Sequence, residues 1–200
     1  FQDSRTGAGD IKYIDQNGDG EINGGLFRPE DHGDLINVGN TSPRYLYGAN
    51  LNFQYKGFDF SAFFQGVGER KMLIFTNAAI PLMQSWRMPW KIQQDYWTPE
   101  NPDAKFPRLY EGASHNARPS THWVQDAAYL RLKNLQVGYT FHQGILDKVG
   151  VSSARVYFSG QDLWEVTKMW FNYYDPENPN NVSFNYPFFR SYAVGVNITL

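Results

Sequence analysis

The chain has 200 residues and a net charge of −2, and it contains no cysteine. A basic surface for nucleic acid is therefore not expected, and disulfides or cysteine-bound zinc are excluded within these residues. Aromatic residues make up 17% of the chain, charged residues only 19%, and the mean hydropathy is −0.54. Without an apolar run long enough for a transmembrane helix, this composition suits an outer-membrane β-barrel or a secreted carbohydrate-binding β-sandwich.

Residues 1–44 have no regular hydrophobic period and are expected to form a loop. They contain Asp15-x-Asn17-x-Asp19-Gly20, which matches the first half of a calcium-binding loop. Side-chain oxygens stand at positions one, three and five, and glycine makes the sharp turn at position six. These oxygens are hard ligands of the kind that calcium prefers, so the loop is a candidate metal site.

The loop departs from the calcium pattern at position twelve, which is Leu26 and cannot bind a cation. An insertion from Gly24 to about residue 32 explains the departure, and Asp34 (or Glu30 or Asp31) then closes the shell. A metal-free turn rich in aspartate and asparagine is the alternative. The predicted structural calcium site comprises Asp15, Asn17, Asp19, Glu21 (through its carbonyl), Asn23 and Asp34.

Residues 45–67 predict a β-hairpin. Apolar side chains occupy every second position from Tyr45 to Tyr55, and a second alternating run starts at Phe58. Between them stands Lys56-Gly57, a two-residue turn in which the glycine supplies a positive φ. Tyr55 and Phe58 lie opposite each other in such a turn and point the same way, so the apolar faces of the two strands coincide.

Residues 68–128 contain no convincing strand, and a structureless stretch of this length is unusual in a compact domain. Alternation resumes over 129–141, where Leu130 and Leu132 have the opposite parity to Leu135 and leave the face of the first half ambiguous. A weaker strand follows at 154–163, so that residues 129–163 form a strand pair. A second loop over 164–189 precedes the final strand, 190–200, whose alternation runs from Tyr192 to Leu200.

The connections between these strands alternate in length: short at 56–57, long at 68–128, moderate at 142–153 and long at 164–189. Short turns on one side and long loops on the other are typical of outer-membrane barrels, with the long loops outside the cell. The predicted fold is all-β: the C-terminal strands, about five, of a large antiparallel transmembrane β-barrel. Because five strands cannot close and the chain opens at Phe1 without a signal peptide, we expect further strands upstream.

Several motifs resemble one family of membrane proteins. The acidic segment Gly9-Asp10-Ile11-Lys12-Tyr13-Ile14-Asp15-Gln16-Asn17-Gly18-Asp19-Gly20 is similar to a loop near the end of SusC/RagA-type TonB-dependent transporters. The further matches follow in the family's order and span nearly the whole chain: Tyr55-Lys56-Gly57-Phe58-Asp59, Tyr96-Trp97-Thr98-Pro99-Glu100-Asn101-Pro102, Tyr129-Leu130-Arg131-Leu132-Lys133-Asn134-Leu135, Asp175-Pro176-Glu177 and Tyr192-Ala193-Val194-Gly195-Val196-Asn197. The family closes with phenylalanine, where this chain has Leu200.

The resemblance implies an outer-membrane barrel of about 22 strands with an N-terminal plug. It also implies energy supplied through TonB, contacted by a plug segment that is not among these residues, and a SusD-like surface lipoprotein that closes the outer mouth. The implied cargo is an oligosaccharide or, in one branch of the family, a peptide. The chain would then be the C-terminal part of the barrel, in the bacterial outer membrane with its C-terminus in the periplasm.

Aromatic side chains in the predicted loops are candidates for stacking on sugar rings, because they combine a flat face with a polar edge. The alternative for each is packing within the loops or against the lid protein, and the segment around Trp97 is better explained as structural. Polar residues on the inner strand face are expected to line the lumen. The substrate candidates are Trp86, Trp90, Trp123 and Trp170, and the lumen candidates are Asn50, Asn52, Gln54, Asp59, Gln65, Gln136, Gln161 and Asn197.

Catalysis finds no support in the sequence. The four histidines have no metal-ligand spacing, and a Gly-x-Ser-x-Gly nucleophile motif is absent. We therefore predict a transporter and not an enzyme. The competing hypothesis is a secreted calcium-binding β-sandwich that binds glycans.

Overall fold

The computed structural model describes residues 4–75, 80–82, 88–112, 115–146, 150–171, 173–178 and 188–200. The chain divides into two compact units. The first contains the described residues of 1–39 and 72–125, and the second contains those of 40–71, 126–178 and 188–200.

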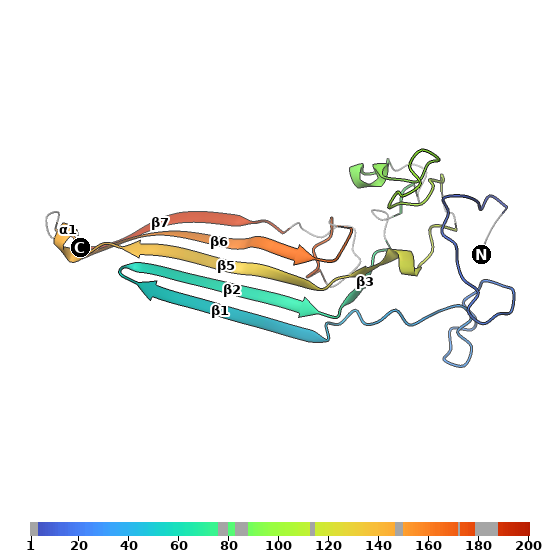
Figure 1. Cartoon of the computed structure of the whole chain (residues 1–200), viewed down its shortest axis with the longest axis horizontal. Coiled ribbons are helices and arrows are strands. Elements are labelled where there is room, and N and C mark those ends of the chain that lie inside the picture. Colours follow the sequence, from blue (N-terminus) through green and yellow to red (C-terminus); the bar gives the residue numbers. More distant parts are fainter. Residues whose placement is uncertain are drawn as a thin grey trace. The chain divides into compact units, whose positions relative to one another are not determined.

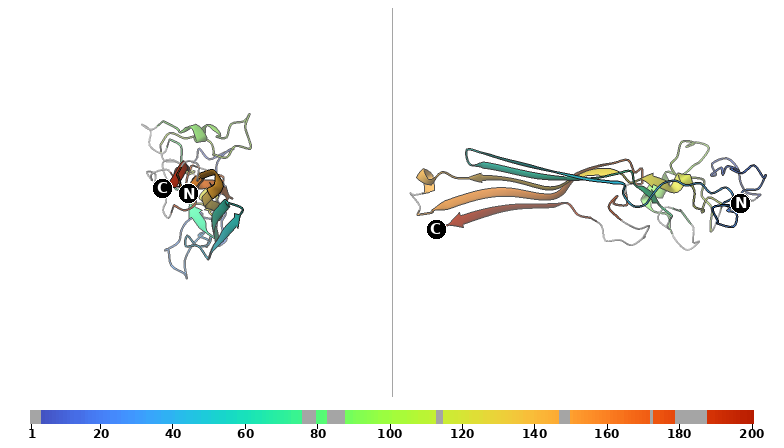
Figure 2. Two further views of the ribbon diagram at one scale, coloured as in Figure 1. Left: turned by 90° about the vertical axis from the view of Figure 1, so that its left-hand side faces the viewer. Right: turned by 90° about the horizontal axis from the view of Figure 1, so that it is seen from below.

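The second unit is a five-stranded antiparallel sheet (Figure 1). Its strands are β1 (Tyr45–Tyr55), β2 (Phe58–Gly68), β5 (Tyr129–Thr140), β6 (Ser153–Thr167) and β7 (Ser191–Thr199), paired in that order. The β1–β2 turn and the connection from β5 to β6, with the helical turn α1 (Gln143–Leu146), lie at one end of this sheet (Figures 1 and 2). The predicted antiparallel all-β fold is confirmed, and the sheet does not close on itself within the described residues.

The register gives this sheet one apolar and one polar face. Tyr55 pairs with Phe58 as the two-residue turn requires, and Phe58 in turn pairs with Tyr139 of β5. The same row continues through Val156 of β6 to Val196 of β7. Much of the apolar face is solvent-exposed in this structure: Tyr45, Tyr47, Leu51, Phe53, Tyr55, Phe58, Val194, Val196 and Ile198 are each at least half exposed.

A β-bulge resolves the ambiguous first half of β5. The register shifts between Leu132 and Asn134 against both neighbouring strands: Lys133 is an extra residue against β2, and Asp162 and Leu163 of β6 stand opposite it. The shift moves Leu130 and Leu132 onto the same face as Leu135. On β6 the matching irregularity lies at Asp162, which has a φ of 52°.

Strand β6 continues to Thr167, beyond the predicted end at residue 163. After the bulge, Trp164 pairs with Leu132 and Val166 pairs with Leu130. The bulge interrupts the period of two, and the predicted strand stops where that period breaks. The predicted end of the strand was therefore wrong: the bulge lies within β6, and the same strand continues for four more residues.

The first unit is built mainly from loops around a small core. The core includes Ile74, Phe106 and Trp123, each about 1% exposed. Two turns of 3-10 helix, η1 (Lys91–Gln94) and η2 (Thr121–Trp123), lie in its second half. The strands β3 (Lys71–Leu73) and β4 (Val124–Asp126) form a two-stranded ladder where a loop was predicted, because three residues are too few to show alternation. No helix among the described residues is long and apolar enough to span a membrane.

Candidate functional site

The predicted calcium loop has an ordered set of side-chain contacts. The carboxylate of Asp15 accepts hydrogen bonds from the backbone amides of Gly18 (2.6 Å) and Gly20 (2.8 Å). Asn17 and Asp19 accept further amides two residues ahead, and the Asn17 side chain donates to Asp19 at 2.8 Å. These contacts fold residues 15–21 into a tight turn around the three side chains.

The structure places Asp34, one of the three candidates for closing the shell, against this loop. Its two carboxylate oxygens accept the backbone amides of Gln16 (2.6 Å) and Asn23 (2.7 Å). The hydrogen bonds from the amides of Gln16 and Asn23 hold the pKa of the Asp34 carboxyl below its ordinary value. The intervening residues 24–33 form the inferred insertion, with Gly25 and Gly33 in close backbone contact at its base.

The fit of these residues to a cation is incomplete. Among the described residues, no three Asp, Glu, His or Cys side chains converge as metal ligands. The oxygens of Asp15 and Asp34 point to backbone amides instead, although an amide bond to one lone pair leaves a second one available for a cation. The structure therefore supplies the predicted residues and the closing carboxylate, but calcium binding stays a prediction.

A buried polar knot fixes the beginning of this acidic segment. The side chain of Asp10 is 1% exposed and accepts hydrogen bonds from the Gly7 amide, the Tyr110 hydroxyl and the Asn116 amide nitrogen at 2.7–2.8 Å. Arg108 forms an ion pair with it at 2.7 Å. Burial by itself raises the pKa of Asp10, but these hydrogen bonds and the positive charge hold it below its ordinary value of 3.8.

The same segment packs on the Tyr-Trp-Thr-Pro motif. Gly9 has a φ of +85°, and a Cβ there would lie 2.3 Å from the ring of Trp97. The carbonyl of Gly9 accepts the amide of Arg108 at 2.8 Å. Two motifs that are about ninety residues apart in sequence are thus in direct contact, which explains why Trp97 is structural.

A cavity of about 860 Å³ lies within the first unit. Its lining is mixed, with Tyr13, Ile22 and Asp34 from the acidic segment and Trp97 and Phe106 from the second half of the unit. Burial raises the pKa of Tyr13 to about 12, so its hydroxyl, which donates to the carbonyl of His115, stays protonated. The cavity size falls within the range of small-molecule sites.

The predicted substrate tryptophans that the structure describes differ in burial. Trp123 is 1% exposed and donates its indole N–H to the Asn116 carbonyl at 3.2 Å, which agrees with the packing alternative. Trp90 is 43% exposed beside η1, and Trp170 is half-buried against Phe171. Trp86 lies outside the described residues. Substrate contact stays a prediction for Trp90, Trp170 and Trp86.

The polar face of the sheet carries a cross-strand ion pair. The register places all eight lumen candidates on this face. Arg155 of β6 reaches across β5 to the carboxylate of Asp59 on β2, with nitrogen–oxygen distances of 2.8 and 2.5 Å. Gly138 lies beneath the pair, and a Cβ there would approach both side chains to within 2.6 Å. The two strands next to β5 are therefore tied by a bidentate bond.

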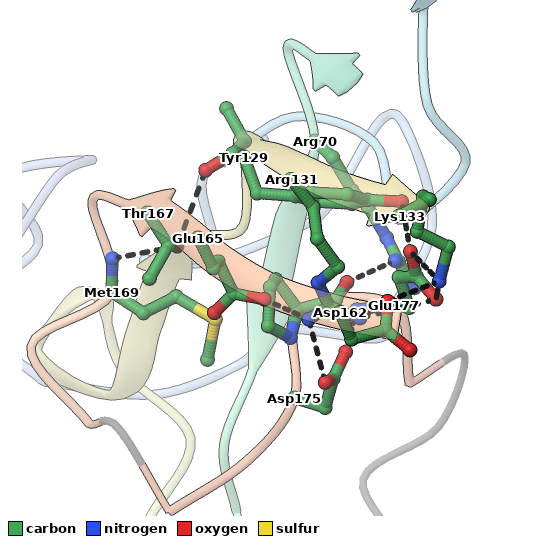
Figure 3. Close-up of polar contacts among 12 residues, drawn as sticks. Arg70, Tyr129, Arg131, Lys133, Asp162, Glu165, Thr167, Met169, Asp175 and Glu177 are labelled. Atoms are coloured by element: carbon green, nitrogen blue, oxygen red, sulfur yellow. Dashed lines mark hydrogen bonds and ion pairs between the residues drawn. The ribbon is translucent and has the colours of Figure 1, made fainter. Parts of the chain in front are cut away.

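A larger charged cluster lies at the opposite end of β5 and β6 from the β1–β2 turn (Figure 3). Arg131 is its centre, 3% exposed, and it pairs with Glu165 of β6 and with Asp175 at 2.6 Å. Glu177 lies 3.3 Å from the Arg131 guanidinium and 3.1 Å from Lys133. Asp162 completes the cluster at 3.0 Å from Lys133.

Sequence analysis identified both segments of this cluster but missed their contact. The Tyr-Leu-Arg-Leu-Lys motif supplies Arg131 and Lys133, and the Asp-Pro-Glu motif supplies Asp175 and Glu177. The available signal was the charge itself: two cations in a strand of otherwise apolar and neutral residues require buried carboxylates nearby.

Comparison with known proteins places this sheet among outer-membrane transporters. No family model matches the chain. The chain is 28% identical to TonB-dependent receptor P26 of Formosa agariphila over 96% of its own length and 20% of the relative. It is 30% identical to TonB-dependent receptor P3 of the same organism, over 90% of its length and 19% of the relative. The chain thus spans about a fifth of the curated relatives that it matches.

Solved structures give the same result for the fold. The RagAB peptide importer in its open-open state superposes with a TM-score of 0.59 and 25% identity, covering 80% of this chain and 17% of the other. A second RagAB peptide transporter structure gives the same TM-score with 28% identity, over 79% of this chain and 17% of the other. The five-stranded sheet is thus of the transmembrane-barrel class, and the β-sandwich hypothesis is not supported.

The particular family follows from the sequence and the structure together. The ordered motifs, the TonB-dependent receptors as relatives and the RagAB structures as neighbours agree. The chain is similar to one part of SusC/RagA-like TonB-dependent transporters, and the predicted resemblance is confirmed.

Proposed function

We propose that the chain contributes five adjacent strands to the barrel of an outer-membrane importer. The observation that carries this proposal is the apolar face, which extends over all five strands opposite a polar face and is most exposed on β1 and β7. In a bilayer the apolar face contacts lipid and the polar face lines the lumen. We call the polar face the lumen face below. The β1–β2 turn and the C-terminal end of β7 lie on the periplasmic side.

Import in this proposal is driven by TonB. The force acts on a plug from elsewhere in the whole transporter, and a SusD-like lipoprotein closes the outer mouth. The support is the similarity to TonB-dependent receptors and to a RagAB importer. These proteins are about five times longer than this chain. This part of the transporter would supply barrel wall and outer loops, with no catalytic step.

The cargo has two candidates. The family resemblance predicts oligosaccharides, with loop tryptophans as stacking platforms. Trp123 is buried, so it cannot be one of those platforms. The second candidate is a peptide, and its support is the similarity to the RagAB peptide importer and peptide transporter structures.

A gene deletion in the native host tests import and cargo together. Deletion and wild-type cells are given either a tryptic digest of casein or a mixture of plant oligosaccharides, and depletion from the medium is followed by mass spectrometry. We expect the deletion to abolish uptake of one mixture, and a protonophore to do the same in wild-type cells. Uptake that persists in both conditions would contradict the proposal.

We further propose that residues 15–34 hold a structural calcium ion in an outer loop. Asp15, Asn17 and Asp19 would supply side-chain oxygens, Glu21 its carbonyl, and Asn23 and Asp34 would close the shell. The support is the placement of the Asp34 carboxylate against the loop, bonded to the amides of Gln16 and Asn23.

The full transporter with Asp15→Ala and Asp19→Ala together tests the calcium proposal. We expect the wild type to retain calcium after dialysis and to become sensitive to protease in this loop when a chelator is added. The double variant should be sensitive with or without chelator. Glu100→Ala is the control, since this exposed carboxylate lies outside residues 15–34 and is not a candidate ligand. Unchanged calcium content in the double variant would refute the site.

A further inference from the structure

The register assigns the side chains near the outer end of β5 to opposite faces. Tyr129 pairs with Val67 and Thr167, and Arg131 pairs with Gln65 and Glu165, all on the lumen face. Between them, Leu130 pairs with Gly66 and Val166 on the apolar face. Side chains at neighbouring positions of this strand therefore lie on opposite faces of the sheet.

Residues 173–178, from the loop between β6 and β7, form polar contacts with lumen-face members of this set. Asp175 pairs with Arg131 at 2.6 Å, and Glu177 accepts the Tyr129 hydroxyl at 2.9 Å (Figure 3). Arg70 follows the end of β2. Its guanidinium donates to the carbonyls of Pro176 (2.5 Å) and Asn178 (2.9 Å). The segment is thus held by the lumen face of β5 and by Arg70, two residues beyond the end of β2.

The held segment is compact and its contacts are buried. Pro176 is less than 2% exposed and Asn178 is 5% exposed. The amides of Glu177 and Asn178 bond back to Asp175 at 2.8 and 2.9 Å, so the segment forms a closed turn. A loop that extended outward into water would not bury these groups against a strand.

We propose that residues 173–178 fold back onto the lumen face and form a fixed shelf that narrows the outer end of the import passage. Arg131 is its positioning residue: it sits among four carboxylates, two of which also form ion pairs with Lys133. Removing Arg131 leaves four negative charges around one lysine, which repel the shelf from the wall. The inference rests on the proposed function, because only a barrel gives the polar face a lumen.

Cross-linking in the full transporter tests which side the shelf lies on. In a cysteine-free background, Glu177→Cys is combined with Tyr129→Cys or, as the matched control, with its neighbour Leu130→Cys. A short bis-maleimide is added to cells, and cross-linked peptides are quantified by mass spectrometry. We expect a strong link from position 129 and a background signal from position 130. Equal links from both positions, or a link from 130 alone, would overturn the proposal.

Release of the shelf tests the role of Arg131. Asn178 is 5% exposed, so the cysteine of an Asn178→Cys variant should react slowly with a membrane-impermeant maleimide. Arg131→Met should raise this labelling rate severalfold, whereas Arg155→Met, which removes an ion pair on the same face without touching the shelf, should not. Outer-membrane assembly is checked by heat-modifiable gel mobility, and Arg131→Lys should give an intermediate rate if Arg131→Met fails to assemble. Labelling unchanged in both Arg131 variants would refute the positioning role.

A block of uptake tests the narrowing itself. Tyr173→Cys, at a residue that is 53% exposed on the shelf, is modified with N-ethylmaleimide or with a polyethylene-glycol maleimide. We expect the large reagent to stop uptake of whichever mixture wild-type cells import, and the small reagent to leave it unchanged. Equal uptake after both would place the shelf outside the passage. If unmodified cells show no energy-dependent uptake while the 129–177 cross-link forms, the proposed function fails and the location of the shelf stands.

Discussion

At the scale of single residues, the acidic segment is positioned by a buried carboxylate and a glycine. Gly9 allows Trp97 to lie against the backbone, and the adjacent Asp10 collects four polar partners from residues 7, 108, 110 and 116. The sequence motif contains both residues, but nothing in it shows that most of their partners lie about ninety to a hundred positions further along the chain. The candidate calcium loop begins five residues after this anchor, so the knot fixes where that loop can lie.

The knot predicts a pH-dependent stability for the first unit. The folded pKa of Asp10 lies below the unfolded value, so its stabilisation is complete above about pH 4 and is lost as the pH falls through the folded pKa. Asp10→Asn should lower the free energy of unfolding by about 2 kcal/mol at pH 7, as expected for hydrogen bonds to a charged group.

Limited proteolysis of the loops, between pH 7 and pH 3, measures this effect. Wild-type protection should fall at acid pH, and the Asp10→Asn variant should be cut faster at pH 7 with less further loss on acidification. Asp126→Asn is the control, because the contacts of that carboxylate are longer: it accepts the Ala128 amide at 3.3 Å and lies 3.7 Å from the ammonium of Lys71. Identical profiles for wild type and Asp10→Asn would contradict the assigned role.

At the scale of elements, period-two alternation predicted the strands well but could not predict where it is interrupted. The hairpin 45–67 agrees with β1 and β2 to within one residue, because a two-residue turn leaves no freedom of register. The face of Leu130 and Leu132 stayed ambiguous until the bulge at Lys133 was seen. A bulge depends on both neighbouring strands, and the alternation within one strand does not contain it.

The assignment of the two faces predicts unequal effects of the same substitution. Leu135 lies at the middle of β5 on the apolar face, and Gln136 is its neighbour on the lumen face. Leu135→Arg should destabilise the transporter by about 2–4 kcal/mol, the cost of placing arginine at the bilayer midplane. Gln136→Arg adds the same charge to a polar surface and should be tolerated.

Unfolding in lipid vesicles with guanidinium chloride measures both variants, followed by tryptophan fluorescence. We expect the unfolding midpoint to fall for Leu135→Arg and to stay near the wild-type value for Gln136→Arg. Equal shifts for the two variants would mean that the faces are not divided between lipid and lumen.

At the scale of the whole molecule, β1 and β7 are the edge strands of the sheet. In a barrel each of them pairs with a further strand, whereas in an open sheet it does not. In the two-residue hairpin the flanking pair, Tyr55 and Phe58, is hydrogen-bonded, so amides at odd positions of β1 point to β2. Amides at even positions, such as that of Asn52, point away from β2. In a closed barrel these amides bond a further strand, because an open edge cannot lie in lipid.

Proline at position 52 tests whether the sheet continues beyond β1. Asn52→Pro removes an amide that β2 does not use, so an open edge strand would tolerate it. In a barrel it breaks the ladder to the next strand, and we expect the full transporter to lose its heat-modifiable folded band. Asn52→Ala keeps the amide and removes only the side chain, so it should assemble normally. Assembly of Asn52→Pro at the wild-type level would leave β1 without a neighbour and contradict barrel closure next to this strand.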